Sequence, residues 1–221
     1  MKICAFSDNH GQLDFQVPPC DLLIIAGDFA PWKGDMFRQG AWVNGPFSNW
    51  LNEQPFGQCV ITPGNHDCVF EKNRYLIVDL PRTTILHEKE IMWNGLKLYG
   101  TSWQPYFCDW AFNRPDTDEH LGKIYQNIPD DTDILVTHCP PFGFCDVVEG
   151  ENDHLGSKML SKRIGQMKEN GHVPKYHFFG HIHTGQHGGV EQDGTRYYNV
   201  ALCDERYRMV NPVTEIELQE K

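Results

Sequence analysis

The sequence predicts an α/β protein in which buried strands are interspersed with helices and carry a polar site at one edge of the sheets. Apolar runs rich in Ile, Leu, Val and Phe, typical of buried strands, occupy residues 2–7, 22–26, 59–62, 133–137 and 176–179. Each run is followed within a few residues by a turn that carries Asp, Asn or His. Polar ligands at the ends of buried strands are typical of sheet proteins whose site lies at one edge.

The remaining elements follow from spacing. Apolar residues between positions 36 and 52 recur at roughly helical spacing, and Gly45-Pro46 is expected to separate a short helical piece from a longer one. Residues 118–126 and 154–169 are predicted to be helical, and residues 196–200 and 213–218 to be strands. No repeat or linker divides the chain, so we expect a single domain spanning residues 1–221.

Charge and composition limit the partners. Lys and Arg number 19 and Asp and Glu number 30, so the formal charge is 19 − 30 = −11. An acidic chain without a basic tract repels polyanions, so long nucleic acid is an unlikely partner and a small anion is favoured. The chain has no apolar run long enough to cross a membrane and no signal-like N-terminal segment, and its eight cysteines lack paired spacing. We therefore expect a cytoplasmic protein with free thiols.

Two short motifs follow the first two strands. Asp8-x-His10 places a carboxylate and an imidazole two residues apart, where both can reach one cation. Gly27-Asp28 adds a carboxylate whose two oxygens can bridge two metals. Each motif alone is equally typical of an exposed turn or a helix cap. These two motifs indicate a metal site only in combination with the motifs that follow them in the chain.

Gly64-Asn65-His66-Asp67 is more specific because it places an amide, a titratable ring and a carboxylate in one turn. Asn65 can bind a metal, or the substrate, through its amide. His66 can lie outside the metal sphere and protonate a leaving oxygen, with Asp67 holding its ring. We therefore predict His66 and Asp67 to be catalytic, and Asn65 and His66 to contact substrate.

Three histidines complete the set of candidate ligands. His138 follows the fourth strand, and Gly180-His181-x-His183 offers two imidazoles after the fifth. A single histidine at a strand end is more often structural. Seven candidate ligands that all follow strand-like runs indicate a metal centre instead, formed by Asp8, His10, Asp28, Asn65, His138, His181 and His183.

This ordered set of motifs resembles the calcineurin-like metallophosphoesterase superfamily. The resemblance implies a four-layer αββα sandwich, with two mixed sheets flanked by helices and a dinuclear metal site at the strand ends. It also implies that Asp8, His10, Asp28 and His183 bind one metal, while Asp28, Asn65, His138 and His181 bind the other. Asp28 would bridge the two cations, and His66 would be the acid that protonates the leaving group.

Further stretches are similar to one subgroup of that superfamily, the metallophosphoesterase-domain (fetal brain protein-like) cyclic nucleotide phosphodiesterases. The stretches are residues 98–107, 110–113, 134–141, 178–183 and 203–212, so the similarity covers nearly the whole chain. Some members of the subgroup have lost the first His of Gly-His-x-His, whereas this chain keeps His181. Cys139 stands where the subgroup usually has Gly, which affects only the expected packing and thiol sensitivity beside His138.

Two divalent cations would supply a hydroxide from a bridging water and neutralise the phosphate oxygens. Mixed oxygen and nitrogen ligands suit Mn²⁺, Fe, Zn²⁺ or Ni²⁺, and Mn²⁺ is favoured. We expect hydrolysis of a small phosphodiester, with a cyclic nucleotide as one candidate. The alternatives are a phosphomonoesterase acting on a nucleotide or phosphoprotein, and a non-catalytic interaction scaffold with the same fold. The oligomeric state is left open.

An aromatic segment between residues 103 and 112 offers a second indication about substrate. Five of its ten residues are Trp, Tyr or Phe, and one or two of these rings could stack on a nucleobase. An aromatic loop packed on the sheet explains most of them equally well. Trp103 is the ring that we expect to contact substrate.

Overall fold

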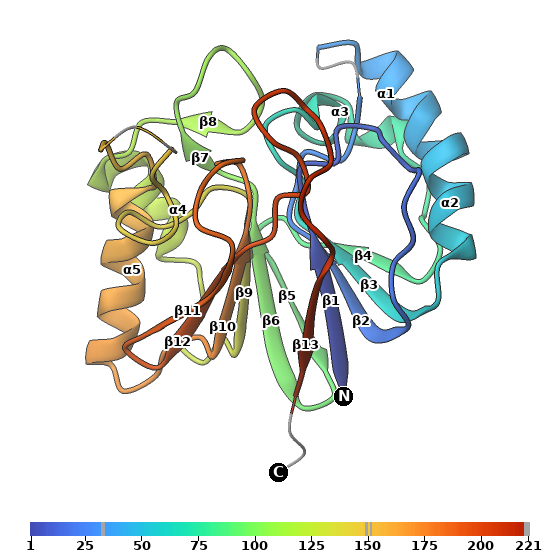
Figure 1. Ribbon diagram of the computed structural model, residues 1–221. Helices are drawn as coiled ribbons and strands as arrows, with labels where there is room; N and C mark the ends of the chain where they lie inside the picture. Colours follow the sequence, from blue (N-terminus) through green and yellow to red (C-terminus); the bar gives the residue numbers. More distant parts are fainter. Residues whose placement is uncertain (32–33, 149, 151, 219–221) are drawn as a thin grey trace.

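Two β-sheets pack face to face and helices cover their outer faces, as the computed structural model shows for residues 1–31, 34–148, 150 and 152–218 (Figure 1). One outer layer contains α1 and α2, and the opposite outer layer contains α4 and α5. The mixed α/β fold with two mixed sheets flanked by helices is therefore confirmed. The extent of the single domain stays a prediction.

The first sheet is built mainly from the N-terminal part of the chain. Its strand order is β13-β1-β2-β3-β4, where β1 to β4 run parallel and β13 pairs antiparallel with β1. The strands are β1 (Lys2–Phe6), β2 (Cys20–Ile25), β3 (Phe56–Ile61), β4 (Thr83–Ile85) and β13 (Thr214–Glu217).

The second sheet has the order β11-β12-β10-β9-β6-β5, with antiparallel strands at both edges. Its strands are β5 (Lys89–Trp93), β6 (Leu96–Thr101), β9 (Ile134–Thr137), β10 (Tyr176–Phe179), β11 (Gly188–Gln192) and β12 (Thr195–Asn199). A separate pair consists of β7 (Gln104–Pro105) and β8 (Asn113–Arg114).

Successive side chains along a strand point to opposite faces of the sheet, which explains why each sheet packs against the other sheet on one face and against helices on the other. In β1, Ile3 and Ala5 belong to the cluster between the sheets, whereas Cys4 and Phe6 belong to the cluster beneath α1 and α2. In the second sheet, Val136 faces the sheet partner and Leu135 packs under the helical layer that contains Leu160. Because both faces of each central strand are covered, these strands have no polar face, which is why they appear in the sequence as continuous apolar runs.

The helices differ from the expectation around Pro46 and at the start of the last helix. They are α1 (Met36–Trp42), α2 (Ser48–Glu53), α3 (Cys68–Lys72), α4 (Lys123–Tyr125) and α5 (Lys158–Glu169), with single turns at η1 (Val43–Phe47), η2 (Arg74–Leu76) and η3 (Asp118–Gly122). Gly45-Pro46 does not separate two helices, because η1 is a π-helical turn that continues α1 directly into α2. Proline has no N–H to donate within a helix, and the wider π-helical turn accommodates it without ending the helix.

The last helix starts later than the spacing predicted. Ser157 caps α5 by accepting the backbone N–H of Leu160 at 3.1 Å, so residues 154–156 belong to the preceding loop. The expected strands near the C-terminus are present as β12 and β13.

The parallel strands end on the same side of the molecule, which is the upper side in Figure 1. The chain crosses between the sheets there, because Ser7 after β1 forms a parallel bridge with Ala201 after β12. The amide of Ser7 donates to Val200 at 2.9 Å, and the amide of Leu202 donates to Ser7 at 3.0 Å. The loops that follow strands of both sheets are therefore held at one edge.

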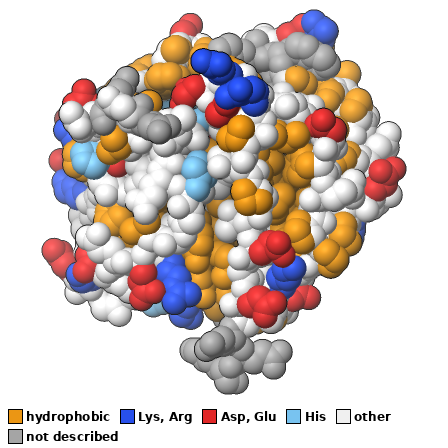
Figure 2. Space-filling model, in the orientation of Figure 1, with side chains coloured by type: hydrophobic (Ala, Val, Ile, Leu, Met, Phe, Trp, Pro, Cys, Tyr) orange, Lys and Arg blue, Asp and Glu red, His pale blue; other side chains and the backbone are white. Residues whose placement is uncertain are grey.

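On the face drawn in Figure 2, the described Lys and Arg side chains form separate groups intermixed with Asp and Glu. That face therefore offers no continuous basic track for a polyanion. Among the described residues, no helix combines the length and the apolar character needed to span a membrane.

The inter-sheet cluster should contribute strongly to stability. Phe178 of β10 is fully buried between the sheets, so Phe178→Ala should lower the free energy of unfolding by about 3–5 kcal/mol. Met92→Ala is the control, because Met92 is 63% exposed and its loss should cost less than about 0.5 kcal/mol. Urea denaturation followed by circular dichroism measures both, and equal losses in the two variants would contradict this account of the core.

Candidate metal centre

The seven predicted ligands lie within a few residues of the carboxyl ends of five strands. Asp8 and His10 follow β1, Asp28 follows β2, and Asn65 follows β3. His138 comes directly after β9, and His181 and His183 come after β10. Parallel strands end at the same edge, so the fold brings these residues together from both sheets.

The first group of ligand atoms contains Asp8, His10 and His183, whose ligand atoms all lie within 4.8 Å of one another. The Nε2 atoms of His10 and His183 are 3.2 Å apart, and Nε2 of His183 lies 3.3 Å from Oδ1 of Asp8. His183 donates its Nδ1 proton to the carbonyl of Asp204 at 3.0 Å, which leaves Nε2 directed at the group. Oδ1 of Asp8 is buried and has no hydrogen-bond partner among the described residues.

The second group contains Asp28, Asn65 and His138. Nε2 of His138 lies 3.3 Å from Oδ2 of Asp28 and 2.8 Å from Oδ1 of Asn65. The other ring nitrogen of His138 donates to the carbonyl of Ala26 at 2.8 Å, so Nε2 is the nitrogen available for a cation. Asp28 belongs to two close triads, one with Asp8 and His138 and one with His10 and His66, so its carboxylate lies near ligand atoms of both groups.

Both groups fit divalent cations. Oδ1 of Asp8, which accepts no hydrogen bond from the described residues, and the converging imidazole nitrogens together form a site that a cation would stabilise. Burial opposes the protonated form of His138 and His183, but the carboxylates of Asp28 and Asp8 outweigh this effect and raise each pKa to about 9. The carboxylates therefore favour positive charge at these rings, and a bound cation would take the place of the proton on Nε2. Burial likewise opposes charge on Asp28, but the imidazoles of His138 and His66 lower its pKa well below the ordinary value.

His181 lies beside the second group. Its backbone N–H donates to Oδ2 of Asp8 at 3.0 Å, and its ring centroid is 5.1 Å from that of His138. Burial lowers the pKa of His181 to about 3, so the ring is neutral and can act as a ligand. Its role as a ligand stays a prediction, because its ring does not belong to the close triads.

His66 lies at the opening of the site. Its Nε2 is 3.8 Å from Oδ2 of Asp28, and its ring packs edge to face against Trp110 with centroids 4.4 Å apart. Together with His10 and Asp28 it also forms a close triad. The geometry therefore allows His66 either to reach a substrate oxygen or to approach a metal.

Asp67 does not hold the ring of His66, contrary to the expectation from the motif. Its carboxylate instead accepts the backbone N–H groups of Asp28 at 2.9 Å, Ala30 at 2.9 Å and Gly64 at 2.8 Å. The reason is burial: Asp67 is fully covered, and the nearest donors are amides of the loops after β2 and β3. Asp67 therefore fixes the backbone of the loops that carry Asp28 and Asn65, because its carboxylate binds the amides of those loops.

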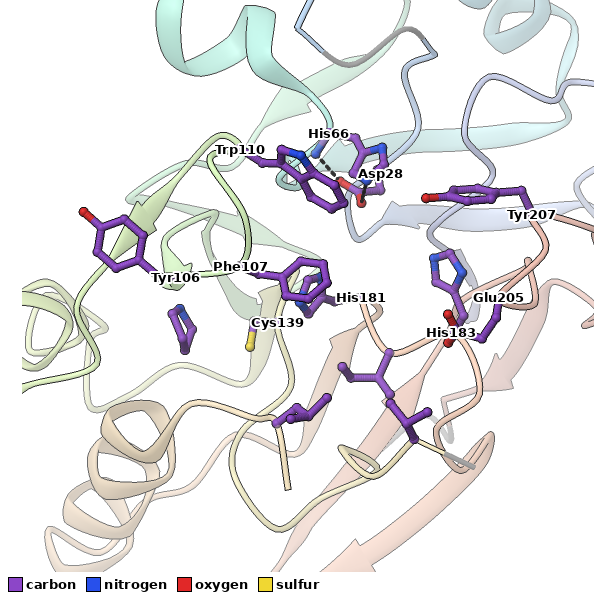
Figure 3. Close-up of a pocket in the computed structure, with 14 residues that line it drawn as sticks. Asp28, His66, Tyr106, Phe107, Trp110, Cys139, His181, His183, Glu205 and Tyr207 are labelled. Atoms are coloured by element: carbon purple, nitrogen blue, oxygen red, sulfur yellow. Dashed lines mark hydrogen bonds and ion pairs between the residues drawn. The ribbon is translucent and has the colours of Figure 1, made fainter. Parts of the chain in front are cut away.

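A cavity of about 510 Å³ opens over the ligands (Figure 3). Asp28, His66, His181 and His183 form its floor, and Figure 3 shows Trp110 and Phe107 on one side and Tyr207 and Glu205 on the other. The other residues that line it are Pro105, Tyr106, Cys139, Val148, Leu155 and Ile182.

Trp103, the ring expected to contact substrate, is placed elsewhere and does not line this cavity. Its indole N–H donates to Glu88 at 3.1 Å, and the guanidinium of Arg114 stacks on the ring at 3.8 Å. The aromatic rings that line the cavity are Tyr106, Phe107, Trp110 and Tyr207. The clustering of aromatics at 103–112 indicated the first three, but no local pattern distinguished Trp110 from Trp103 or singled out Tyr207.

Asp28→Asn should lower metal occupancy at both positions, because its carboxylate lies near ligand atoms of both groups. Metal content after dialysis against Mn²⁺ should fall from two ions per chain to one or fewer, as measured by plasma mass spectrometry. Asp153→Asn is a matched control at an exposed carboxylate. Full two-metal content in the Asp28 variant would contradict the bridging role.

Asp67→Asn should act through the backbone. An amide replaces one carboxylate oxygen with a donor, which leaves buried N–H groups without an acceptor at a cost of about 1–3 kcal/mol. Thermal unfolding should show this loss together with weaker metal retention. When the Asp67→Asn variant is saturated with metal, its rates on esters with good and poor leaving groups should stand in the same ratio as those of the native protein. A changed ratio would show that Asp67 acts directly on His66.

Comparisons with known proteins agree with this geometry. Residues 1–185 match the family model described as calcineurin-like phosphoesterase. Metallophosphoesterase domain-containing protein 1 of Homo sapiens is 32% identical, over 98% of this chain and 71% of its own length. UPF0046 protein K07C11.7 of Caenorhabditis elegans is 28% identical, over 92% of this chain and 70% of its own length.

Among solved structures, the phosphopantetheinyl hydrolase PptH from Mycobacterium tuberculosis superposes with a TM-score of 0.58 over 93% of this chain and 90% of its own. At 14% identity this likeness concerns the fold alone. The family model spans most of the chain and includes all seven predicted ligands and His66. The chain belongs to the calcineurin-like phosphoesterase family.

Proposed function

We propose that this chain is a phosphodiesterase that uses two divalent cations. The observation that carries the proposal is the meeting of two groups of ligand atoms on Asp28, beneath a cavity that is open to solvent. Asp8, His10 and His183 would hold one cation, Asn65, His138 and His181 the other, and Asp28 both. When bound, the cations supply an activated water nucleophile and neutralise charge on the phosphate.

The lining of the cavity favours a diester over a monoester. The described residues that line it include no Lys or Arg, and they include the exposed carboxylate of Glu205. A monoester carries a second negative charge near neutral pH, which such a lining does not help to neutralise. A diester carries one charge and two carbon-bearing groups, which suit aromatic and aliphatic walls. A cyclic nucleotide is a compact example.

Two side chains act on the substrate directly in this proposal. The amide Nδ2 of Asn65 is buried and has no hydrogen-bond partner among the described residues, so it can donate to a phosphate oxygen. His66 lies at the opening of the site and donates its proton to the departing alkoxide. Mn²⁺ is the favoured metal, and the cytoplasm is the proposed compartment.

An activity panel tests the reaction class. Protein stripped of metal and reloaded with Mn²⁺ is assayed on bis(nitrophenyl) phosphate, nitrophenyl phosphate and cyclic nucleotides. The proposal expects metal-dependent cleavage of the diesters to exceed that of the monoester. Faster cleavage of the monoester would establish a phosphomonoesterase, and absence of turnover on every ester would establish a non-catalytic scaffold.

The variant His66→Ala distinguishes two roles of His66, a general acid and a metal ligand. The variant should keep its bound metal and lose about 100-fold or more in kcat on alkyl diesters, whose leaving alkoxides need a proton. Nitrophenyl diesters leave without one and should lose less than about 10-fold. His120→Ala is the control, because His120 is exposed and does not line the cavity. Loss of a metal ion, or an equal loss of kcat on both ester types, would contradict the acid role.

A further inference from the structure

A compact turn at residues 204–208 stands over the metal centre. Oδ1 of Asp204 accepts the backbone N–H groups of Arg206 and Arg208, each at 2.9 Å, and its other oxygen pairs with the guanidinium of Arg208. The carbonyl of Asp204 accepts the N–H of Tyr207 at 2.8 Å and also Nδ1–H of His183 at 3.0 Å. One residue therefore fixes both a metal-facing imidazole and the turn that carries Tyr207.

Tyr207 is held with its ring over the site. Its backbone lies in the left-handed region at φ 58°, and its carbonyl accepts the side-chain amide of Gln12 at 3.0 Å. The ring centroid is 4.6 Å from that of His10 and 5.6 Å from that of His183. A left-handed backbone conformation is unfavourable for tyrosine, and the hydrogen bonds of the turn maintain it. Nevertheless 45% of this residue's surface stays exposed.

The rings of Trp110 and Tyr207 lie on either side of His66. The centroid of His66 is 4.4 Å from that of Trp110 and 6.4 Å from that of Tyr207. Figure 3 shows Trp110 beside His66 on one side of the cavity and Tyr207 across from it. An acid must come within hydrogen-bonding distance of the leaving oxygen, so the carbon atoms attached to that oxygen extend into the space between these two rings.

We propose that Trp110 and Tyr207 form the walls of a subsite for the leaving alcohol, and that this alcohol is neutral and apolar or aromatic. The inference rests on the proposed function, because it takes His66 as the acid. Aromatic walls favour apolar or planar groups, and the exposed carboxylate of Glu205 on the same turn disfavours an alcohol that carries a second anionic group. The turn Asp204–Arg208 is then the element that selects the leaving group.

The test compares two series of diesters on the manganese-loaded protein. In the first, the retained ester is methyl and the leaving alcohol is phenol or 2-naphthol, two alcohols of similar acidity that differ in aromatic area. In the second, the leaving group is nitrophenol and the retained ester is methyl or phenyl. The native protein should prefer the naphthyl over the phenyl leaving group on the order of tenfold in kcat/KM, chiefly through KM.

Tyr207→Ala should abolish the naphthyl preference and retain both metal ions. It should lower kcat/KM for the two nitrophenyl diesters of the second series by the same factor, so that their methyl-to-phenyl ratio does not change. Tyr207→Phe should keep the preference, because the ring remains. Arg208→Gln should reduce the preference in part, because the turn loses its guanidinium pair and the exposed side chain is not needed for folding. Tyr75→Ala is the matched control, since Tyr75 is 80% exposed and does not line this cavity.

A second measurement does not depend on turnover. Calorimetric titration of the metal-loaded native protein with 2-naphthol should show binding that Tyr207→Ala weakens on the order of tenfold. Equal losses on every diester with reduced metal content would overturn the inference in favour of a purely structural Tyr207. So would an effect confined to the retained-ester series, or naphthol binding that the variant does not change. If no diester is cleaved but naphthol binding depends on Tyr207, the proposed function fails and the apolar subsite stands.

Discussion

The site depends on the buried carboxylate of Asp67 and the backbone amides that it binds. Its two oxygens accept N–H groups from Asp28 and Ala30 after β2 and from Gly64 after β3, which ties the two loops into one unit. Oδ1 of Asp28 in turn accepts the N–H of His66 at 2.7 Å. Burial and the neighbouring Asp28 carboxylate raise the pKa of Asp67 to about 8, so cations bound nearby would favour its charged form. Charged Asp67 would therefore stabilise the backbone of the two loops, and bound metals would in turn stabilise the charged form of Asp67.

Around this unit the backbone is held in conformations that side chains rarely adopt. Asp8, His10, Asp28 and His181 all have positive φ values between 45° and 68°. Left-handed residues other than glycine cost about 1–3 kcal/mol each, and they persist where the surrounding contacts determine them. Close packing explains the adjacent glycines. A Cβ at Gly64 would lie 2.3 Å from Oδ1 of Asp28, and one at Gly180 would lie 2.1 Å from Oδ2 of Asp8. The carboxylates occupy the space that a side chain would need.

Both sheets contribute to the metal centre. The first supplies the carboxylates, the amide of Asn65 and the imidazole of His10, and the second supplies the imidazoles of His138, His181 and His183, so the centre exists only when the sheets are packed. The bridge between Ser7 and Ala201 fixes that packing beside the ligands. The same crossing segment continues into the turn at 204–208, which places Tyr207 over the metal-facing rings. The segment that joins β12 to β13 therefore positions both Tyr207 and the metal-facing imidazole of His183.

The sequence by itself determined the candidate ligands and the five strands that precede them, because burial on both faces produces continuous apolar runs and the polar motifs follow where those runs end. Those signals are local. The sequence did not predict β4, β5, β6 or β11. The tertiary structure alone decided that Asp67 binds loop amides, that Trp110 lines the cavity while Trp103 packs against Arg114, and that Tyr207 stands over His10. It also decided that the chain stays helical through Pro46. Each of these depends on contacts between residues far apart in the chain or on a backbone conformation imposed by packing, and neither leaves a mark in the local order of residues.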